Sequence, residues 1–213
     1  MSALRVVGFL PYAALTSQST GEIALLQELK ARGCDVTTVL CDGAFSDCDL
    51  HQPRANGVWQ RPARACLNCQ AEAAGLMAKA DMPFRWLGRW LEDGDFSTAA
   101  GWLANLGRAE YPDATINGWA MGLWVRSSVQ AHVGTETLAL DQPHVRMTYA
   151  SYMNSALLTC LALTRLYDDV KPDALLILNG HMAVLRAASE LAQSRGIRVL
   201  SDAGAKRDFV GTV

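Results

Sequence analysis

Residues 171–200 read KPDALLILNGHMAVLRAASELAQSRGIRVL and hold the clearest structural pattern in the sequence. The run ALLIL (174–178) is continuously apolar, which is typical of a strand buried on both faces of a parallel sheet. Residues 182–196 have a helical pattern ending at glycine, and the short apolar run IRVL (197–200) follows. This order of elements predicts a right-handed βαβ unit with parallel strands.

The same pattern occurs near the N-terminus. The runs LRVVGFL (4–10) and DVTTVL (35–40) indicate two more buried strands. Between them, residues 19–22 (STGE) have the S-x-x-E form of a capping box, which predicts that a helix begins there. Two βαβ units supply at least four parallel strands. We therefore predict an α/β protein with a doubly wound, Rossmann-like parallel sheet, in one domain spanning residues 1–213.

Residues 41–145 are interpreted as a Cys-rich and partly helical insertion within this domain. Helices are predicted over residues 70–79 and 119–133, and the stretch FRWLGRWL (84–91) is interpreted as aromatic side chains that pack in the core. A long helix is expected from residue 146 until shortly before Pro172.

The composition excludes several classes of protein. The net charge is −2 with a pI near 6.1, which disfavours a general nucleic-acid or anionic-membrane binder. Half of the residues are hydrophobic, yet no apolar run reaches the roughly 18 residues that a membrane span needs. The first residues, MSALRVVGFLPY, lack the form of an export signal. We therefore expect a soluble, cytoplasmic protein without a transmembrane segment.

Four of the six cysteines lie between residues 41 and 69. They are Cys41, Cys48, Cys66 and Cys69. The C-x-x-C pair is expected to form a turn that places two sulfurs on one side, and the upstream pair follows a predicted strand. Four thiolates predict a structural zinc site, and an iron–sulfur cluster is the alternative metal centre. Two readings without metal stay open, namely idle buried thiols and a redox pair.

Ligands of doubly wound sheets bind outside the carboxyl ends of the strands. His181 and Asp202 follow two predicted strands there and are the candidate catalytic residues. The candidate substrate-binding residues, which follow the strands or lie in the first connecting loop, are Tyr12, Ser17, Ser19, Thr20, Asp42, Asn179 and Gly180. Capping and packing roles are the structural alternative for these side chains. The first loop lacks G-x-G-x-x-G, so a dinucleotide cofactor is not expected.

A family resemblance rests on the motifs FLPY, CDG-x-x-x-x-CD, C-x-x-C-Q, KPDALLILNGH and RGIRVL. With them, most of residues 4–204 resembles the N-terminal half of bacterial capsule and surface-polysaccharide glycosyltransferases of the GT-B type. The resemblance implies binding of a carbohydrate or lipid-linked acceptor. Two positions depart from the family: it usually has N-G-R where His181 stands, and H-E-x-G at residues 201–204. The sequence ends at Val213, so the nucleotide-sugar donor is expected to bind a further domain or a partner subunit.

The sequence thus carries three hypotheses. The first is a glycosyltransferase-like enzyme part that binds the acceptor. The second is a non-catalytic, metal-stabilised Rossmann-like binding module. The third is a thiol redox protein, which requires a reactive C-x-x-C at an exposed helix start.

Overall fold

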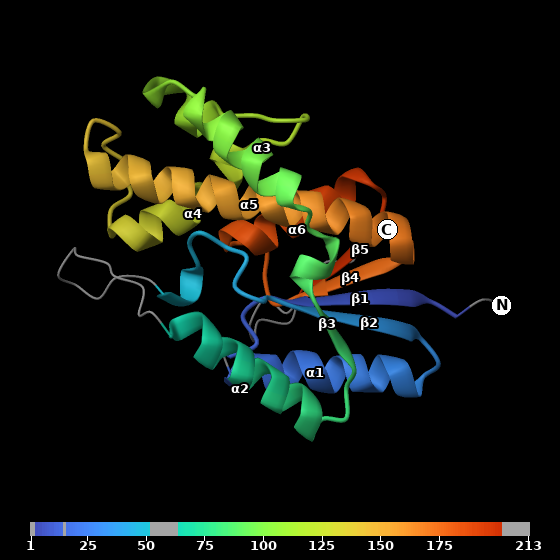
Figure 1. The fold of residues 1–213 in the computed structure, drawn as a ribbon. Coiled ribbons are helices and arrows are strands. Elements are labelled where there is room, and N and C mark those ends of the chain that lie inside the picture. The colour runs from blue at the N-terminus through green and yellow to red at the C-terminus, as the bar shows by residue number, and fades with distance from the viewer. Residues whose placement is uncertain (1–2, 15, 52–63, 202–213) are drawn as a thin grey trace.

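The computed structural model describes residues 3–14, 16–51 and 64–201, which form an α/β domain around a parallel sheet (Figure 1). The strands in these ranges are β1 (Arg5–Leu10), β2 (Asp35–Leu40), β3 (Phe84–Trp86), β4 (Ala174–Ile177) and β5 (Arg198–Ser201). The helices are α1 (Thr16–Ala31), α2 (Ala65–Lys79), α3 (Asp93–Ala104), α4 (Met121–Val133), α5 (Pro143–Val170) and α6 (Ala183–Ser194). Short 3₁₀ helices are η1 (Asp49–His51), η2 (Leu87–Trp90) and η3 (Arg108–Asp113).

The strand order is β3-β2-β1-β4-β5, and every pair is parallel. The chain moves outward from β1 to β2 and β3, then returns through α5 to place β4 on the other side of β1. The order therefore reverses between β1 and β4, which is the switch point where such sheets bind ligands. This arrangement confirms the predicted doubly wound, Rossmann-like fold.

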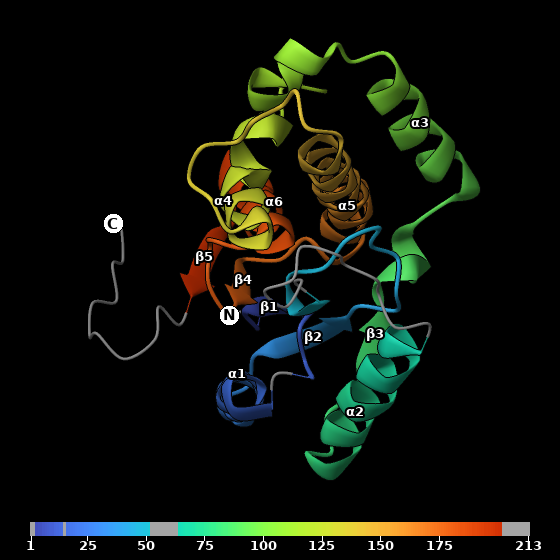
Figure 2. The same ribbon diagram turned by 90° about the vertical axis from the view of Figure 1, so that its left-hand side faces the viewer.

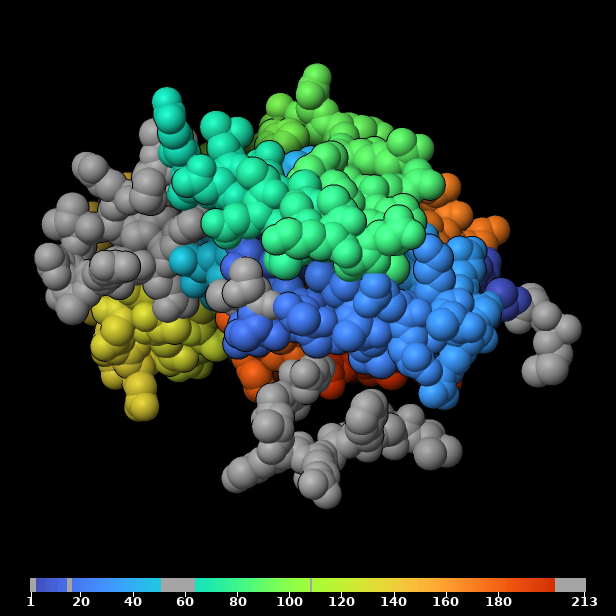
Figure 3. All heavy atoms as spheres, turned by 90° about the horizontal axis from the view of Figure 1, so that it is seen from below, coloured from blue at the N-terminus to red at the C-terminus, as the bar shows by residue number. Residues whose placement is uncertain are grey.

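Each face of the sheet has its own apolar core because alternate strand residues point to opposite sides. Val6, Leu10 and Leu176 pack with α1 and α2 on one face. Val7, Phe9 and Ile177 pack on the other face, where α4, α5 and α6 lie. Figure 2 shows the sheet between these two helical layers, and Figure 3 shows α1 and α2 covering the lower face.

Gly8 explains how closely α1 approaches the sheet. A Cβ on Gly8 would lie 2.6 Å from the Cδ1 atom of Leu26, which is fully buried on α1. A side chain at this position of β1 would push α1 away from the strand. The glycine inside β1 therefore serves helix–sheet packing.

Two predicted helix starts were wrong. Helix α1 begins at Thr16, so Ser19 and Glu22 lie inside the helix and are not a capping box. Helix α2 begins at Ala65, so Cys66 and Cys69 lie in its first turns and do not form a turn before it. Both helices begin earlier than the sequence predicted. Ser19 in the first turn of α1 donates to the Tyr12 carbonyl after β1, and Cys66 and Gln70 of α2 lie beside Gly43 after β2.

The middle of the chain contributes to the sheet. The stretch 84–91 was interpreted as packing residues, but Phe84–Trp86 forms edge strand β3 beside β2. Within residues 41–145, α2 and β3 complete a third parallel crossover, whereas α3 and α4 pack against α5. Helix α5 has 28 residues, but none of the helices in the described ranges is long and apolar enough to cross a membrane.

Candidate functional site

Three connections meet at the carboxyl edge of the sheet near the switch point. Tyr12 follows β1, residues 41–51 follow β2, and residues 179–182 connect β4 to α6. Parallel pairing of β1 with both β2 and β4 places these connections on one edge. Helices α4 and α5 lie above this edge (Figure 1), and Ser128 of α4 and Ser155 of α5 hydrogen-bond to its connections.

Asp49 is the centre of a hydrogen-bonded chain at this edge. The Tyr12 hydroxyl donates to Asp49 Oδ2 at 2.6 Å, and the Ser128 hydroxyl of α4 also donates to this carboxylate. Ser128 Oγ in turn accepts the backbone N–H of Ala183, at the start of α6, at 2.8 Å. One carboxylate thereby connects the segments after β1, β2 and β4.

Burial shifts the protonation equilibria of this chain. It raises the pKa of Asp49 above its usual value, although the hydrogen bonds from Ser128 and Tyr12 act in the opposite direction. It also raises the pKa of Tyr12 well above its usual value, and the neighbouring Asp49 charge adds to this effect. Tyr12 therefore stays a neutral hydroxyl donor at physiological pH.

A second group of polar side chains lies beside this chain. His132 Nδ1 is 3.3 Å from the Tyr152 hydroxyl, and burial lowers the His132 pKa. Ser155 on α5 accepts the backbone N–H of Asp47 and donates to its carbonyl. Burial raises the Tyr152 pKa, and the charges of Asp49 and Asp47 add to it.

We call this set of residues the Asp49 cluster. It comprises Tyr12, Asp47, Cys48, Asp49, Ser128, His132, Tyr152 and Ser155. Clustered groups with shifted pKa values at a ligand-binding edge are typical of functional sites. Of its members, only Tyr12 was among the predicted substrate-binding residues. Two sequence features could have indicated this cluster. They are the sequence D-C-D at residues 47–49, after β2, and the i, i+4 spacing of Ser128 and His132 on one helix face.

The predicted site residues after β4 have structural partners. Asn179 Oδ1 accepts the backbone N–H groups of His181 at 3.0 Å and Met182 at 3.4 Å, next to the start of α6. The His181 carbonyl accepts the Ser127 hydroxyl at 2.6 Å, and the His181 side chain is exposed. Gly180 is half-buried beside them. Asp202 lies outside the described residues.

The other predicted binding residues are divided between interior and surface. Ser19 is buried, and its hydroxyl donates to the Tyr12 carbonyl at 3.4 Å, so it fixes the segment after β1. Ser17 and Thr20 have exposed side chains on α1. Asp42 follows β2, and its Oδ2 accepts the Gly88 N–H at 2.9 Å.

The cysteines divide between two places. Cys41 lies close enough to Cys66 and Cys69 for their charges to interact, and burial raises the Cys41 pKa to about 12. Cys48 lies beside Tyr12 and Tyr152, whose pKa values its charge raises. Throughout residues 3–14, 16–51 and 64–201, no three His, Cys, Asp or Glu side chains are grouped so that they could hold a metal ion. The zinc site stays a prediction.

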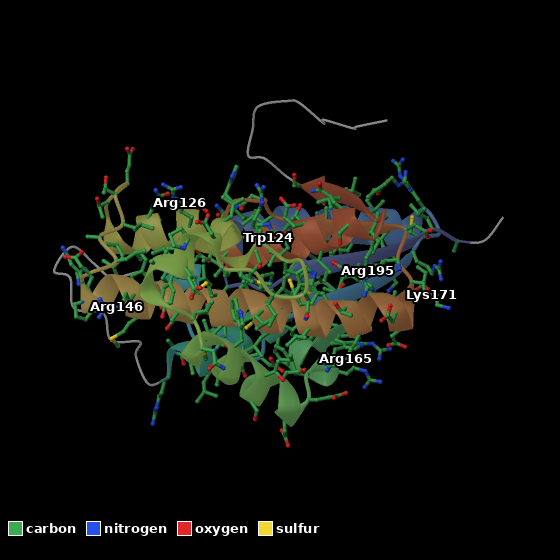
Figure 4. All side chains as sticks on the ribbon, turned by 90° about the horizontal axis from the view of Figure 1, so that it is seen from above. Trp124, Arg126, Arg146, Arg165, Lys171 and Arg195 are labelled. Carbon is green, nitrogen blue, oxygen red and sulfur yellow. The ribbon has the colours of Figure 1, made fainter. Side chains whose placement is uncertain are left out.

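A shallow hollow of about 450 Å³ lies at the opposite, amino edge of the sheet. Arg195 there donates to the Thr164 carbonyl and pairs with Asp168 at 2.7 Å. Figure 4 shows Arg195 and Lys171 at the far end of the helical layer from Arg146. Cations at the C-terminal ends of helices offset the partial negative charge of the last carbonyls. We therefore assign these residues to helix stabilisation.

The fold and the edge site together define the protein as a Rossmann-like α/β domain with a buried polar cluster at its switch point. No family model and no curated protein sequence matches the chain. Among solved structures, the chain is similar to a CDPS from Fluoribacter dumoffii, with a TM-score of 0.55 and 10% identity. The match covers 93% of this chain and 87% of the other. At this identity the similarity shows a shared fold alone.

Proposed function

We propose that the chain is the acceptor-binding half of a GT-B-type glycosyltransferase of surface-polysaccharide biosynthesis. The Asp49 cluster at the switch point is the observation that supports this proposal. Sugars present many hydroxyls, and their recognition requires fixed donors and acceptors at the ligand-binding edge. A carboxylate held by Tyr12 and Ser128 suits a sugar hydroxyl because Asp49 is half-buried and can accept a further hydrogen bond.

In this proposal the protein binds a carbohydrate or lipid-linked acceptor in the cytoplasm. The nucleotide-sugar donor binds a further domain or a partner subunit that closes over the same edge. The exposed His181 ring at this edge is the candidate base for the acceptor hydroxyl, and Asp202 is the second candidate. The chain alone should then bind acceptor fragments without transferring a sugar.

Nuclear magnetic resonance titration with short oligosaccharide acceptors tests the proposal. We expect shifts of the amide signals around Tyr12, Asp49 and Ala183, and weaker binding by Asp49→Asn. The matched control is Asp168→Asn, an exposed carboxylate at the amino edge that should bind like the parent. Sugar transfer by the isolated chain, or equal binding by Asp49→Asn, would contradict the proposal.

A second candidate is a non-catalytic, metal-stabilised binding module. It is favoured by the role of Asn179, whose side-chain oxygen accepts backbone N–H groups of His181 and Met182 in the turn before α6. The two candidates differ in one measurement. Addition of a donor-binding partner and nucleotide sugar should produce transfer in the first case and acceptor binding alone in the second.

We also propose that the cysteine segment binds one structural zinc ion, with an iron–sulfur cluster as the alternative. The proximity of Cys41 to Cys66 and Cys69 supports this proposal. The four predicted ligands, Cys41, Cys48, Cys66 and Cys69, fit the group only in part because Cys48 lies beside Tyr12 and Tyr152. The bound ion would stabilise the connection between β2 and α2 and would supply no step of sugar transfer.

A further inference from the structure

Two cysteines lie at the start of α2, three positions apart. Cys66 and Cys69 are the second and fifth residues of a helix that begins at Ala65. Ideal helix geometry places the Cα atoms of such residues about 5 Å apart, which is within the range that a disulfide spans. The two sulfurs are therefore close enough in the chain to form one disulfide.

The N-terminal end of α2 suits an attacking sulfur. The first N–H groups of a helix have no partner within it, so negative charge is favoured at this end. The N-cap residue is Arg64, which is positively charged and makes no side-chain capping hydrogen bond. The first turn contains no acidic residue. Reactive cysteines are found in such surroundings, and a C-x-x-C pair at a helix start is typical of redox proteins.

The pair is accessible to a small reagent. Cys66 and Cys69 are both half-buried, and Leu67 and Asn68 between them are exposed. Cys48 and Cys160, by contrast, are buried in the apolar core on the α4–α6 face of the sheet. Buried structural cysteines are inert in exchange reactions because a reagent cannot reach them.

Cys41 lies near the pair but is a different kind of thiol. It is close enough to Cys66 and Cys69 for their charges to interact, and burial raises its pKa to about 12. It therefore stays protonated at physiological pH, and its sulfur accepts the backbone N–H of Gly43 at 3.3 Å. A protonated thiol is a poor nucleophile. Cys41 should therefore not compete with Cys69 for the sulfur of Cys66.

From these observations we infer that Cys66 and Cys69 form a redox pair that exchanges with small-molecule disulfides. The Cys66 thiolate attacks one sulfur of the reagent, the S–S bond of the reagent breaks, and the departing thiolate takes up a proton. The Cys69 thiolate then attacks the Cys66 sulfur and expels the second reagent thiol. The chain loses two electrons and two protons, and one reagent disulfide becomes two thiols.

The inference goes beyond the proposed sugar binding and does not rest on the proposed zinc ion. It needs two sulfurs and no third ligand. An ion held by the same sulfurs would block the exchange, so the two proposals predict different reactivities for Cys66 and Cys69.

Redox titration of the reduced full chain tests the inference. The protein is equilibrated with mixtures of oxidised and reduced glutathione, with and without a chelator, then alkylated and read by mass spectrometry. We expect Cys66 and Cys69 to lose their reactivity together, in one two-electron transition, as an internal disulfide. Cys69→Ser should stop at a mixed disulfide between Cys66 and glutathione. The control is Cys34→Ser, a half-buried thiol in the turn before β2, which should keep the parent's transition.

The parent chain supplies the decisive measurement, so a variant that does not fold leaves the test valid. An internal disulfide that includes Cys41, or mixed disulfides alone, would overturn the inference. Metal retained in both arms with Cys66 and Cys69 unreactive would overturn it and support the zinc proposal. Circular dichroism should show the same helix content before and after oxidation. Loss of helix content on oxidation would show that the disulfide does not fit the start of α2 and would also overturn the inference.

Discussion

Asp49 shows how single residues create the site from distant parts of the chain. Its partners Tyr12 and Ser128 are separated from it by 37 and 79 positions, yet both hydroxyls donate to one carboxylate. Hydrogen bonds to a charged group are stronger than neutral ones, so each partner contributes both stability and orientation.

The first prediction concerns the Tyr12 hydroxyl. Tyr12→Phe should lower the free energy of unfolding by about 2 kcal/mol, because the half-buried Asp49 carboxylate then loses a donor. Chemical denaturation at pH 7 measures the change. The control is Tyr111→Phe, whose ring makes an edge contact with Tyr149 that the substitution keeps. Equal stability of Tyr12→Phe and the parent would contradict the role assigned to this hydrogen bond.

A second prediction follows from buried His132. Burial lowers its pKa in the folded protein below the roughly 6.5 of an unfolded chain. The unfolded state therefore binds the proton first as pH falls, so stability is present above about pH 6.5 and is lost below it. His132→Gln should reduce the fall in unfolding free energy between pH 7 and pH 5. His144→Gln, at an exposed position on α5, should keep the parent's slope, and an unchanged slope in His132→Gln would exclude the effect.

At the scale of elements, an ion pair attaches α3 to the long helix α5. Arg165 donates to both oxygens of Asp95, at 2.6 and 2.8 Å, and to the Trp90 carbonyl at 2.9 Å. The Asp95 side chain is only 7% exposed. Hydrogen bonds from Arg165 lower the Asp95 pKa. This bidentate contact attaches α3, from the middle of the chain, to α5.

The third prediction is that Asp95→Asn destabilises the protein by about 2 kcal/mol at pH 7. The contribution of Asp95 is present above about pH 4 and is lost as pH falls through its lowered pKa. The difference from the parent should therefore shrink in acid. Urea denaturation across this pH range provides the measurement. Asp93→Asn, an exposed carboxylate in the same first turn of α3, is the matched control and should cost much less.

Gly43 follows β2 and lies beside Cys66 and Gln70 of α2. The fourth prediction compares it with Gly33. Both have positive φ, of +89° and +86°, so an alanine at either position costs about 1–3 kcal/mol. At Gly43 the new Cβ would also lie 3.1 Å from Gln70 Nε2, whereas nothing lies within 4 Å at Gly33. Gly43→Ala should therefore melt at a lower temperature than Gly33→Ala. The reverse order would show that the Gly43 surroundings give way freely.

For the whole molecule, the sheet connects two cores that lie on its opposite faces. Leu26 of α1 is fully buried in the core under the α1–α2 layer, and Leu175 of β4 is fully buried in the core under the α4–α6 layer. Both layers share the same strands, so loss of one exposes the backbone on which the other packs. The two cores should therefore unfold together.

The fifth prediction is that Leu26→Ala and Leu175→Ala each lower the unfolding free energy by about 2–5 kcal/mol within one transition. Tryptophan fluorescence reports mainly on the middle of the chain, and far-ultraviolet circular dichroism reports on all helices. The two midpoints should coincide in both variants. A biphasic curve for one variant would show that its layer unfolds separately.

The architecture could be predicted from the sequence because the hydrophobic patterns of single strands and helices determine it. Apolar runs of five to seven residues such as 4–10 and 174–178, each followed by a helical pattern, allow few arrangements other than parallel crossovers. Edge strand Phe84–Trp86 was missed because three residues carry too little periodicity. The start of α1 was misplaced because the sequence STGE inside the helix has the form of a capping box. The start of α2 was missed because its N-cap residue, Arg64, makes no side-chain capping hydrogen bond.

The sequence by itself determined the doubly wound fold and the edge of the sheet where Tyr12, Asp42 and Asn179 lie. Only the tertiary structure decided which side chains meet there. Asp49, Ser128 and Tyr152 come from three elements, and no spacing along the chain encodes the way α4 and α5 pack over the carboxyl edge. Local patterns specify elements through backbone geometry, whereas a polar cluster depends on contacts between residues far apart in sequence. Cys48, one residue from Asp49, is an example: its position beside Tyr12 depends on a contact between residues far apart in sequence.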